Sequence, residues 1–266
     1  MFRHTLEMNE LPPSPRRRTG CSFWLIAGLI ATCISVAAAP AKAIDFFTPT
    51  LLDGQRVEVD VSLGASTLAT RYASLDVIFA PFGKIDETGF RLGLGTSGTA
   101  YNFVASQDPW TLGSGRDFDN IASAGYQYVS PRLTVFTMLG VLVSSSEDQG
   151  VSRTKAGVFG TLSASALPSK DTIASLSGRF SNVSNTYQAQ ARMGLRYSGS
   201  IFLGPEVAIG GTTPFVQGMP ISQEQFGVFI SGVSVKTAWL GFSSGVVNQD
   251  QLGLGAYFNF SLSLAF

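Results

Sequence analysis

Most of the chain alternates, one position at a time, between apolar residues and small or polar residues. The last sixteen residues, QLGLGAYFNFSLSLAF (251–266), carry Leu, Ala or Phe at every even position and mainly Gly, Asn and Ser between them. Successive strand residues point to opposite faces, so this pattern predicts a strand with one apolar and one polar face. Soluble strands usually have about five or six residues, whereas about sixteen can cross a bilayer even when tilted.

A single strand of this kind leaves its edge amides unsatisfied in lipid, and only closure into a barrel removes the edges. The closing aromatic, Phe266, is also typical of the last strand of bacterial outer-membrane barrels, where it resembles the signal read by the barrel assembly machinery. The alternative is an edge strand of a soluble β-sandwich.

The same period of two recurs along the chain, for example in RVEVDVSL (56–63) and YQAQARMGLRY (187–197). Such a period indicates strands rather than helices. Twelve segments follow it: 55–67, 70–82, 88–104, 115–129, 132–145, 153–166, 171–181, 186–198, 201–211, 221–233, 235–247 and 251–266. Twelve is even, as bacterial single-chain barrels require. Because the alternation is weakest in 235–247, a ten-strand barrel is the alternative. The predicted fold is all-β, a single closed antiparallel transmembrane β-barrel.

The connections and aromatic residues give an independent check. With both barrel ends in the periplasm, the longer connections 105–114, 146–152 and 212–220 lie outside and the short turns 130–131 and 199–200 inside, although 83–87 is long for an inner turn. Aromatic residues then gather at two levels, as expected for interfacial girdles. The inner level holds Phe82, Phe90, Tyr126, Tyr128, Tyr197 and Phe266, and the outer level holds Phe118, Tyr187 and Phe226.

The N-terminus predicts export. Three arginines (16–18) precede an apolar stretch (23–39), and Ala-Lys-Ala (41–43) forms a cleavage site, so residues 1–43 are predicted to be a signal peptide and 44–266 the barrel. An uncleaved anchor is one alternative. A lipoprotein that uses Cys33 is another, although Thr32 fits poorly before the cysteine.

Removal of residues 1–43 takes away both cysteines and the only histidine, and leaves 13 Lys+Arg against 16 Asp+Glu. That balance argues against a nucleic-acid partner. No remaining segment has the apolar length of a transmembrane helix. Charged residues are only 14% of the chain, where about 25% is usual for soluble domains.

This chemistry disfavours an enzyme. Lipid-hydrolysing barrels generally pair a serine with histidine, and none of the remaining lysines stands in a recognisable Ser–Lys motif. Asp117 with Asp119, and Glu58 with Asp60, share strand faces and could bind Ca²⁺ or flank a glycosidic bond. The simpler interpretation is that these carboxylates are lumen charges that form ion pairs with arginines. We therefore predict no catalytic residue, no cofactor and no metal site.

A lumen charge network is the main site prediction. Its members lie on the polar faces of predicted strands: Arg91, Arg179, Arg192, Arg196 and Glu206. The eighth and ninth strands are neighbours, so Glu206 is expected to meet Arg196 and to narrow the periplasmic end of the lumen.

Several stretches resemble the cellulose biosynthesis protein BcsS family. They are TRYASLDVIFAPFGKIDETGFRLGLGTSGTAYNF (70–103), FLGPEVAIGG (202–211), QFGVFISG (225–232) and the final GAYFNFSLSLAF. The sequence departs from the family where Asn102 and Phe103 stand in place of tyrosine, and its loops are poor in tryptophan.

This resemblance implies a non-catalytic outer-membrane accessory protein of bacterial cellulose (exopolysaccharide) biosynthesis or secretion, with outer-membrane lipid, the barrel assembly machinery, and cellulose or another glucan as partners. The predicted glucan contacts lie on outer connections, where Trp110, Phe215 and Gln217 offer stacking and hydrogen bonding. A small general or saccharide-selective porin is the first alternative, and a lipid-modifying enzyme is the second.

Overall fold

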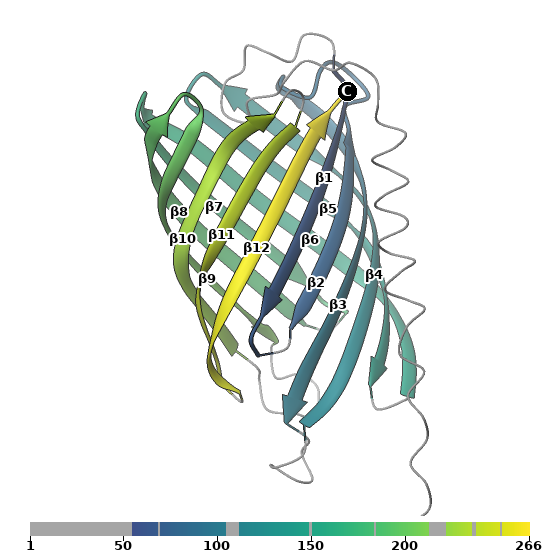
Figure 1. Cartoon of the computed structure of the whole chain (residues 1–266). Helices are drawn as coiled ribbons and strands as arrows, with labels where there is room; N and C mark the ends of the chain where they lie inside the picture. The colour runs from purple at the N-terminus through teal and green to yellow at the C-terminus, as the bar shows by residue number, and fades with distance from the viewer. Residues whose placement is uncertain are drawn as a thin grey trace, which may run out of the picture. The chain divides into compact units, whose positions relative to one another are not determined.

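The computed structural model describes residues 55–68, 70–104, 112–148, 151–183, 185–212, 222–235, 238–250 and 252–266. Within these ranges the chain forms twelve antiparallel strands that close into one barrel, in which each strand pairs with its neighbours in sequence and β1 pairs with β12 (Figure 1). The strands are β1 (Val57–Ser66), β2 (Arg71–Phe79), β3 (Gly89–Val104), β4 (Leu112–Ser130), β5 (Leu133–Asp148), β6 (Val151–Ser169), β7 (Thr172–Ser181), β8 (Thr186–Ser198), β9 (Ile201–Thr212), β10 (Ser222–Val235), β11 (Ala238–Gln249) and β12 (Gly253–Ala265).

The predicted twelve-strand barrel is confirmed, and the ten-strand alternative is wrong, because β11 pairs along its whole length with both β10 and β12. The ends of the barrel sequence complete the closure. The amides of Arg56 and Val57 donate to the carbonyl oxygen of Phe266 at 2.8 and 3.2 Å. In the part of the chain that the structure describes, no helix is long and apolar enough to cross a membrane. The predicted signal peptide (1–43) lies outside the described residues.

Alternation divides the wall into two faces, as the pleat of a strand requires. The outer face carries exposed apolar side chains such as Leu94, Val141 and Leu195, whereas the alternate positions point into the lumen. Exposed aromatic rings occupy both predicted levels, with Tyr126 and Tyr128 near one rim and Phe118 and Phe226 near the other. This outward apolar band between two aromatic girdles is the surface that a transmembrane barrel presents to lipid.

The two rims differ. The C-terminal rim holds Phe266 and the turns that end β2, β4, β6 and β8. At the opposite rim, which we call the far rim, β3 to β6 have 16 to 19 residues, whereas β1 and β2 on one side have 10 and 9 and β7 on the other side has 10. These four strands therefore continue past the turn between β1 and β2, as their lower ends show in Figure 1.

The lumen contains three clusters of buried apolar side chains. One lies toward the far rim and includes residues of β4 to β6 and of the turn after β7: Ile121, Leu142, Phe159 and Val183. Two lie toward the C-terminal rim, formed by Ile173, Phe202 and Phe229, and by Ala80, Ile85, Trp239 and Ala265. The interior is therefore partly a packed core, which the alternation of polar and apolar positions did not predict.

Candidate functional site

The centre of the lumen holds a buried carboxylate with two partners. Glu206 on β9 is 1% exposed, and its Oε2 accepts from Arg192 Nε on β8 at 2.5 Å. Its Oε1 accepts from the Tyr257 hydroxyl on β12 at 2.8 Å. Arg192 and Glu206 face each other directly in the β8–β9 register, so the ion pair needs little backbone adjustment. A buried carboxylate requires such pairing because removing a lone charge from water costs several kcal/mol.

Two glycines allow Tyr257 to reach a carboxylate three strands away. Tyr257 faces Gly245 on β11, Gly245 faces Gly227 on β10, and Gly227 faces Glu206. A Cβ atom at Gly227 would collide with the Tyr257 hydroxyl. The absence of side chains at these two positions therefore lets the phenol lie along the wall. We call this row of Arg192, Glu206 and Tyr257 the central latch.

The predicted contact between Glu206 and Arg196 is wrong. Arg196 faces Phe202 on β9. It lies four residues after Arg192 on β8, a distance of about 13 Å along the strand. Its guanidinium stacks on the Phe202 ring at 4.7 Å and donates through Nε to the Lys170 carbonyl at 2.8 Å. It also donates to the Gly199 carbonyl, so Arg196 joins two turns at the C-terminal rim. The prediction failed because it took both charges to lie close to the connection between β8 and β9.

Closure of the C-terminal rim depends instead on Arg91. This side chain is fully buried and donates through Nη2 to the carbonyls of Lys84 and Ile85, each at 3.0 Å, and to that of Glu87. All three acceptors belong to the connection between β2 and β3 (80–88), which we call the inward turn. Its Nε also donates to Gln127 Oε1 at 3.0 Å, which fixes the guanidinium to β4.

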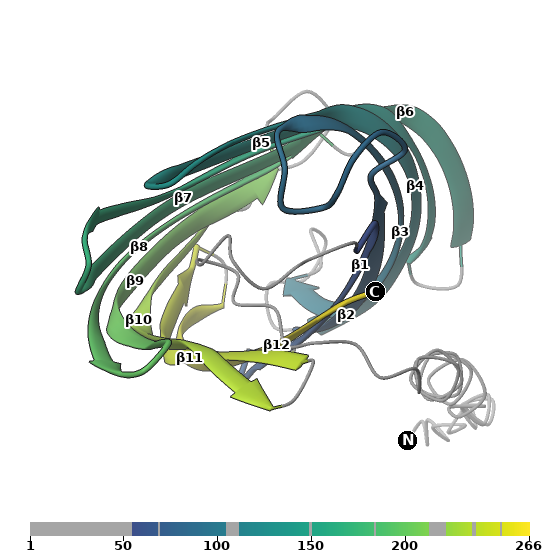
Figure 2. The same ribbon diagram turned by 90° about the horizontal axis from the view of Figure 1, so that it is seen from above.

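The inward turn also has an apolar anchor. Ile85 is 3% exposed and packs in the cluster with Ala80, Trp239 and Ala265, while its amide donates to the Gln55 carbonyl at 2.9 Å. Figure 2 shows the turn folded over the opening at this end of the barrel. Only a connection longer than a tight turn can fold in this way, which accounts for the length of 83–87. The single apolar residue in KIDE (84–87) was the sequence signal for this anchor.

One acidic group of the inward turn is poorly solvated. Asp86 Oδ1 is buried without a hydrogen-bond partner among the described residues. Burial raises the pKa of the Asp86 carboxyl, and the charge of Glu87 adds to this rise, while Lys84 and Arg91 oppose it. The closed position of the turn therefore disfavours the charged form of Asp86.

Two further groups of charged side chains lie on separate parts of the lumen wall. Arg179 stacks on Phe159 at 4.9 Å and Arg192 on Phe229 at 5.3 Å, on the side formed by β6 to β10. Glu58, Asp60 and Asp76 lie on β1 and β2, where Asp60 and Asp76 face each other and Ser263 donates to Asp60.

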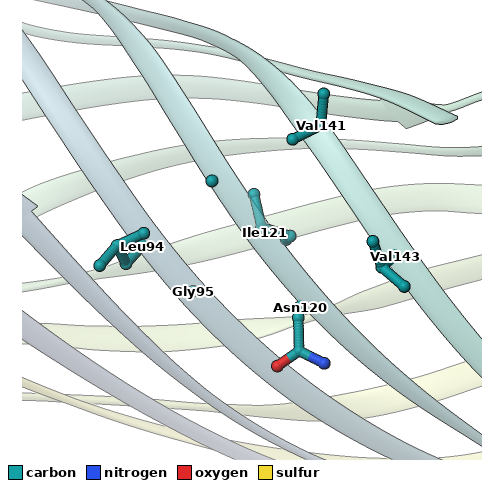
Figure 3. A pocket seen from close by; sticks show the side chains of 7 residues that line it. Leu94, Gly95, Asn120, Ile121, Val141 and Val143 are labelled. Atoms are coloured by element: carbon teal, nitrogen blue, oxygen red, sulfur yellow. The ribbon is translucent and has the colours of Figure 1, made fainter. Parts of the chain in front are cut away.

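The described lumen residues include no histidine and no cysteine. Within the described ranges no cluster of three or more His, Cys, Asp or Glu side chains could hold a metal ion. A hollow lies on the outer wall over β3 to β5, and its lining includes Leu94, Asn120, Val141 and Val143 (Figure 3). It belongs to the lipid-facing surface. Trp110, Phe215 and Gln217, the predicted glucan contacts, lie outside the described residues.

Comparison with solved structures returns outer-membrane barrels of low similarity. The KdgM porin is 13% identical with a TM-score of 0.44, over 79% of this chain and 99% of that one. The translocator domain of the autotransporter NalP from Neisseria meningitidis is 11% identical with a TM-score of 0.48, over 92% and 98%. Outer membrane phospholipase A from Escherichia coli is 10% identical with a TM-score of 0.40, over 85% and 98%. These values support no conclusion about function.

No curated protein matches the sequence significantly. The family model of the cellulose biosynthesis protein BcsS, however, matches residues 70–266, which include all of β2 to β12. The closed barrel and its lipid-facing band confirm the predicted outer-membrane location, because strands cross a membrane only in closed barrels. The chain belongs to the BcsS family of cellulose biosynthesis proteins.

Proposed function

We propose that this outer-membrane protein is a non-catalytic accessory of bacterial cellulose biosynthesis or secretion, a scaffold that holds glucan at the cell surface. The observation that carries the proposal is the partly packed lumen with a covered C-terminal rim. Three apolar clusters and the central latch occupy the interior, and the inward turn covers the C-terminal rim, which we place in the periplasm. A conduit for a polymer would need a continuous polar passage instead.

The contacts of the buried lumen carboxylate support the non-catalytic part of the proposal. The most buried carboxylate, Glu206, has both oxygens engaged, by Arg192 and by Tyr257. A general base needs a free position within hydrogen-bond reach of the substrate. Glu206 therefore suits a structural role.

Glucan contact is expected at the far rim and its connections, where Trp110, Phe215 and Gln217 lie in the sequence. The test is a deletion strain that carries Trp110→Ala with Phe215→Ala, scored for cellulose retained on cells and released into the medium. We expect less retained cellulose at unchanged barrel abundance. Tyr197→Ala removes an exposed aromatic at the opposite rim and is the matched control. Equal loss in both variants, or none in either, would contradict glucan contact at these positions.

A second measurement separates the scaffold from the porin alternative. The purified barrel should show little ion conductance in planar bilayers because its lumen is packed. A large steady conductance of the unmodified protein, together with normal cellulose output in the deletion strain, would favour the porin and end the scaffold proposal.

A further inference from the structure

The part of β3 to β6 that extends past the barrel has a polar lumen-side face built in rows. On this face Asp117 pairs with Ser146, and Ser146 with Arg153. One step nearer the barrel, Asp119 pairs with Ser144, and Ser144 with Lys155. Two neighbouring rows thus repeat the same order of carboxylate, hydroxyl and cation.

These charges are available to a ligand. Arg153 and Lys155 are exposed, and the whole segment 151–156 is exposed on both faces, so no other described part of the barrel backs it. Among the described residues, Asp119, Arg153 and Lys155 form no ion pair or side-chain hydrogen bond. In each row the backbone positions of the carboxylate residue and the cationic residue are two strand spacings, about 10 Å, apart, which leaves room for a group between the side chains.

An aromatic ring lies beside the rows. Tyr101 on β3 faces Gly115 on β4, and a Cβ atom at Gly115 would lie 2.6 Å from Tyr101 Cζ, so the ring covers the wall where the glycine leaves it bare. The Tyr101 hydroxyl reaches Asp117 Oδ1 at 3.5 Å. Below the rows, Ile121 and Leu142 begin an apolar cluster on the same part of the wall. The lumen-side face therefore changes from polar to apolar below the rows, and we call its polar part the recess.

The chemistry of this recess selects one class of ligand. Carboxylates accept hydrogen bonds from hydroxyl groups, and guanidinium and ammonium groups donate to them, while a tyrosine ring packs against an apolar face. Within the two rows, two positive and two negative charges balance, so a polyanion or a polycation is attracted to one end of each row and repelled by the other. A neutral, polyhydroxylated chain avoids that conflict.

We infer that the lumen-side face of the extended β3–β6 wall, with Tyr101, Asp119, Arg153 and Lys155 at its centre, is a binding site for a neutral glucan chain. This inference rests on the proposed function, to which it adds a site within the described part of the chain. The predicted contacts on the connections would then hold the same chain from outside.

The test is calorimetric titration of the purified full-length barrel in detergent with cellohexaose, an oligogalacturonate hexamer and a chitosan hexamer. We expect binding of cellohexaose and weaker binding of both charged hexamers. Arg153→Met with Lys155→Met should weaken cellohexaose binding about tenfold, the effect of losing one or two hydrogen bonds. Tyr101→Ala should weaken it similarly, whereas Tyr101→Phe keeps the ring and should retain most of it.

The matched control is Arg71→Met with Arg116→Met, which removes two cations from the outer face of the barrel. Arg116 precedes Asp117 on β4, and Arg71 on β2 shares its row through Ala100. Equal weakening by this control, no weakening by the Arg153 and Lys155 variant, or preference for a charged hexamer would overturn the site. Failure of the unmodified barrel to bind cellohexaose would also overturn the proposed site. The proposed function is decided separately by cellulose output of the deletion strain, so the two failures are distinguishable.

Discussion

Replacing Arg91 by Met should release the inward turn from the C-terminal rim while leaving the barrel wall closed. Methionine keeps an unbranched apolar stem but removes every donor of the guanidinium. The carbonyls of Lys84, Ile85 and Glu87 then lose the group that holds them to β3. Only the packing of Ile85 and a few backbone hydrogen bonds still keep the turn in place.

The magnitude follows from these three hydrogen bonds. Released carbonyls at the rim are hydrated, so each bond contributes a net stabilisation of about 1 kcal/mol, or about 3 kcal/mol together. This corresponds to a rise of about a hundredfold or slightly more in the population of the open turn. When opening is fast relative to cleavage, the rate of proteolysis rises by the same factor.

Digestion with a lysine-specific protease measures this population, because Lys84 lies inside the inward turn. The fragment ending at Lys84 should appear far faster in Arg91→Met than in the unmodified barrel, and heat-modifiable migration on a detergent gel verifies closure. Arg179→Met is the matched control, since Arg179 is a lumen arginine that stacks on Phe159. Unchanged cleavage at Lys84, or the same increase in the control, would refute the role assigned to Arg91.

Three further predictions concern stability. Glu206→Gln should lower the free energy of unfolding by about 1–3 kcal/mol in urea titrations, because it takes the charge from a buried hydrogen-bonded pair, and it should leave cellulose output nearly unchanged; loss of output with normal folding would make the lumen the working part. Gly227→Val should impair barrel assembly, seen as less heat-modifiable protein, because its side chain would collide with Tyr257 and the Ser244 carbonyl; normal assembly would argue against the central latch. Asp86→Asn should raise the thermal midpoint at pH 7 and have little effect near pH 3. The pKa of the Asp86 carboxyl is raised, so its contribution to stability is present below the ordinary pKa and is lost as pH rises through the raised value; an unchanged midpoint at pH 7 would show that the closed turn does not oppose the charge.

The wall of the barrel could be predicted because its physics is local. The two faces of each strand can be predicted from the period of two in its own sequence, without knowing which strand it pairs with. The segment of β11 was less secure, because Trp239 and glycines blur its alternation and an even strand number allows both ten and twelve. The direction of each strand then placed the aromatic girdles.

The lumen was less predictable because its contacts join residues that no local pattern relates. Pairing of Glu206 with Arg192 and not Arg196 depends on the register between β8 and β9, which a period of two leaves open by any even shift. The only sequence signal for Tyr257 was its size, because it is the one large residue on the small-residue face of the last strand. Its partner three strands away depends on glycines in β10 and β11.

The two glycines beneath Tyr257 have a consequence for how the strands find their correct alignment. A slip of one residue exchanges the two faces of a strand and is opposed by the membrane itself. A slip of two residues keeps every side chain on its proper face, so lipid cannot detect it. If β10 slipped by two, Gln225 or Phe229 would take the place of Gly227 under the phenol and block its approach to Glu206. The row of glycines thus makes a two-residue slip of β10 sterically unfavourable during barrel closure. It disfavours the misalignments that leave the apolar face toward lipid and that the hydrophobic effect cannot oppose.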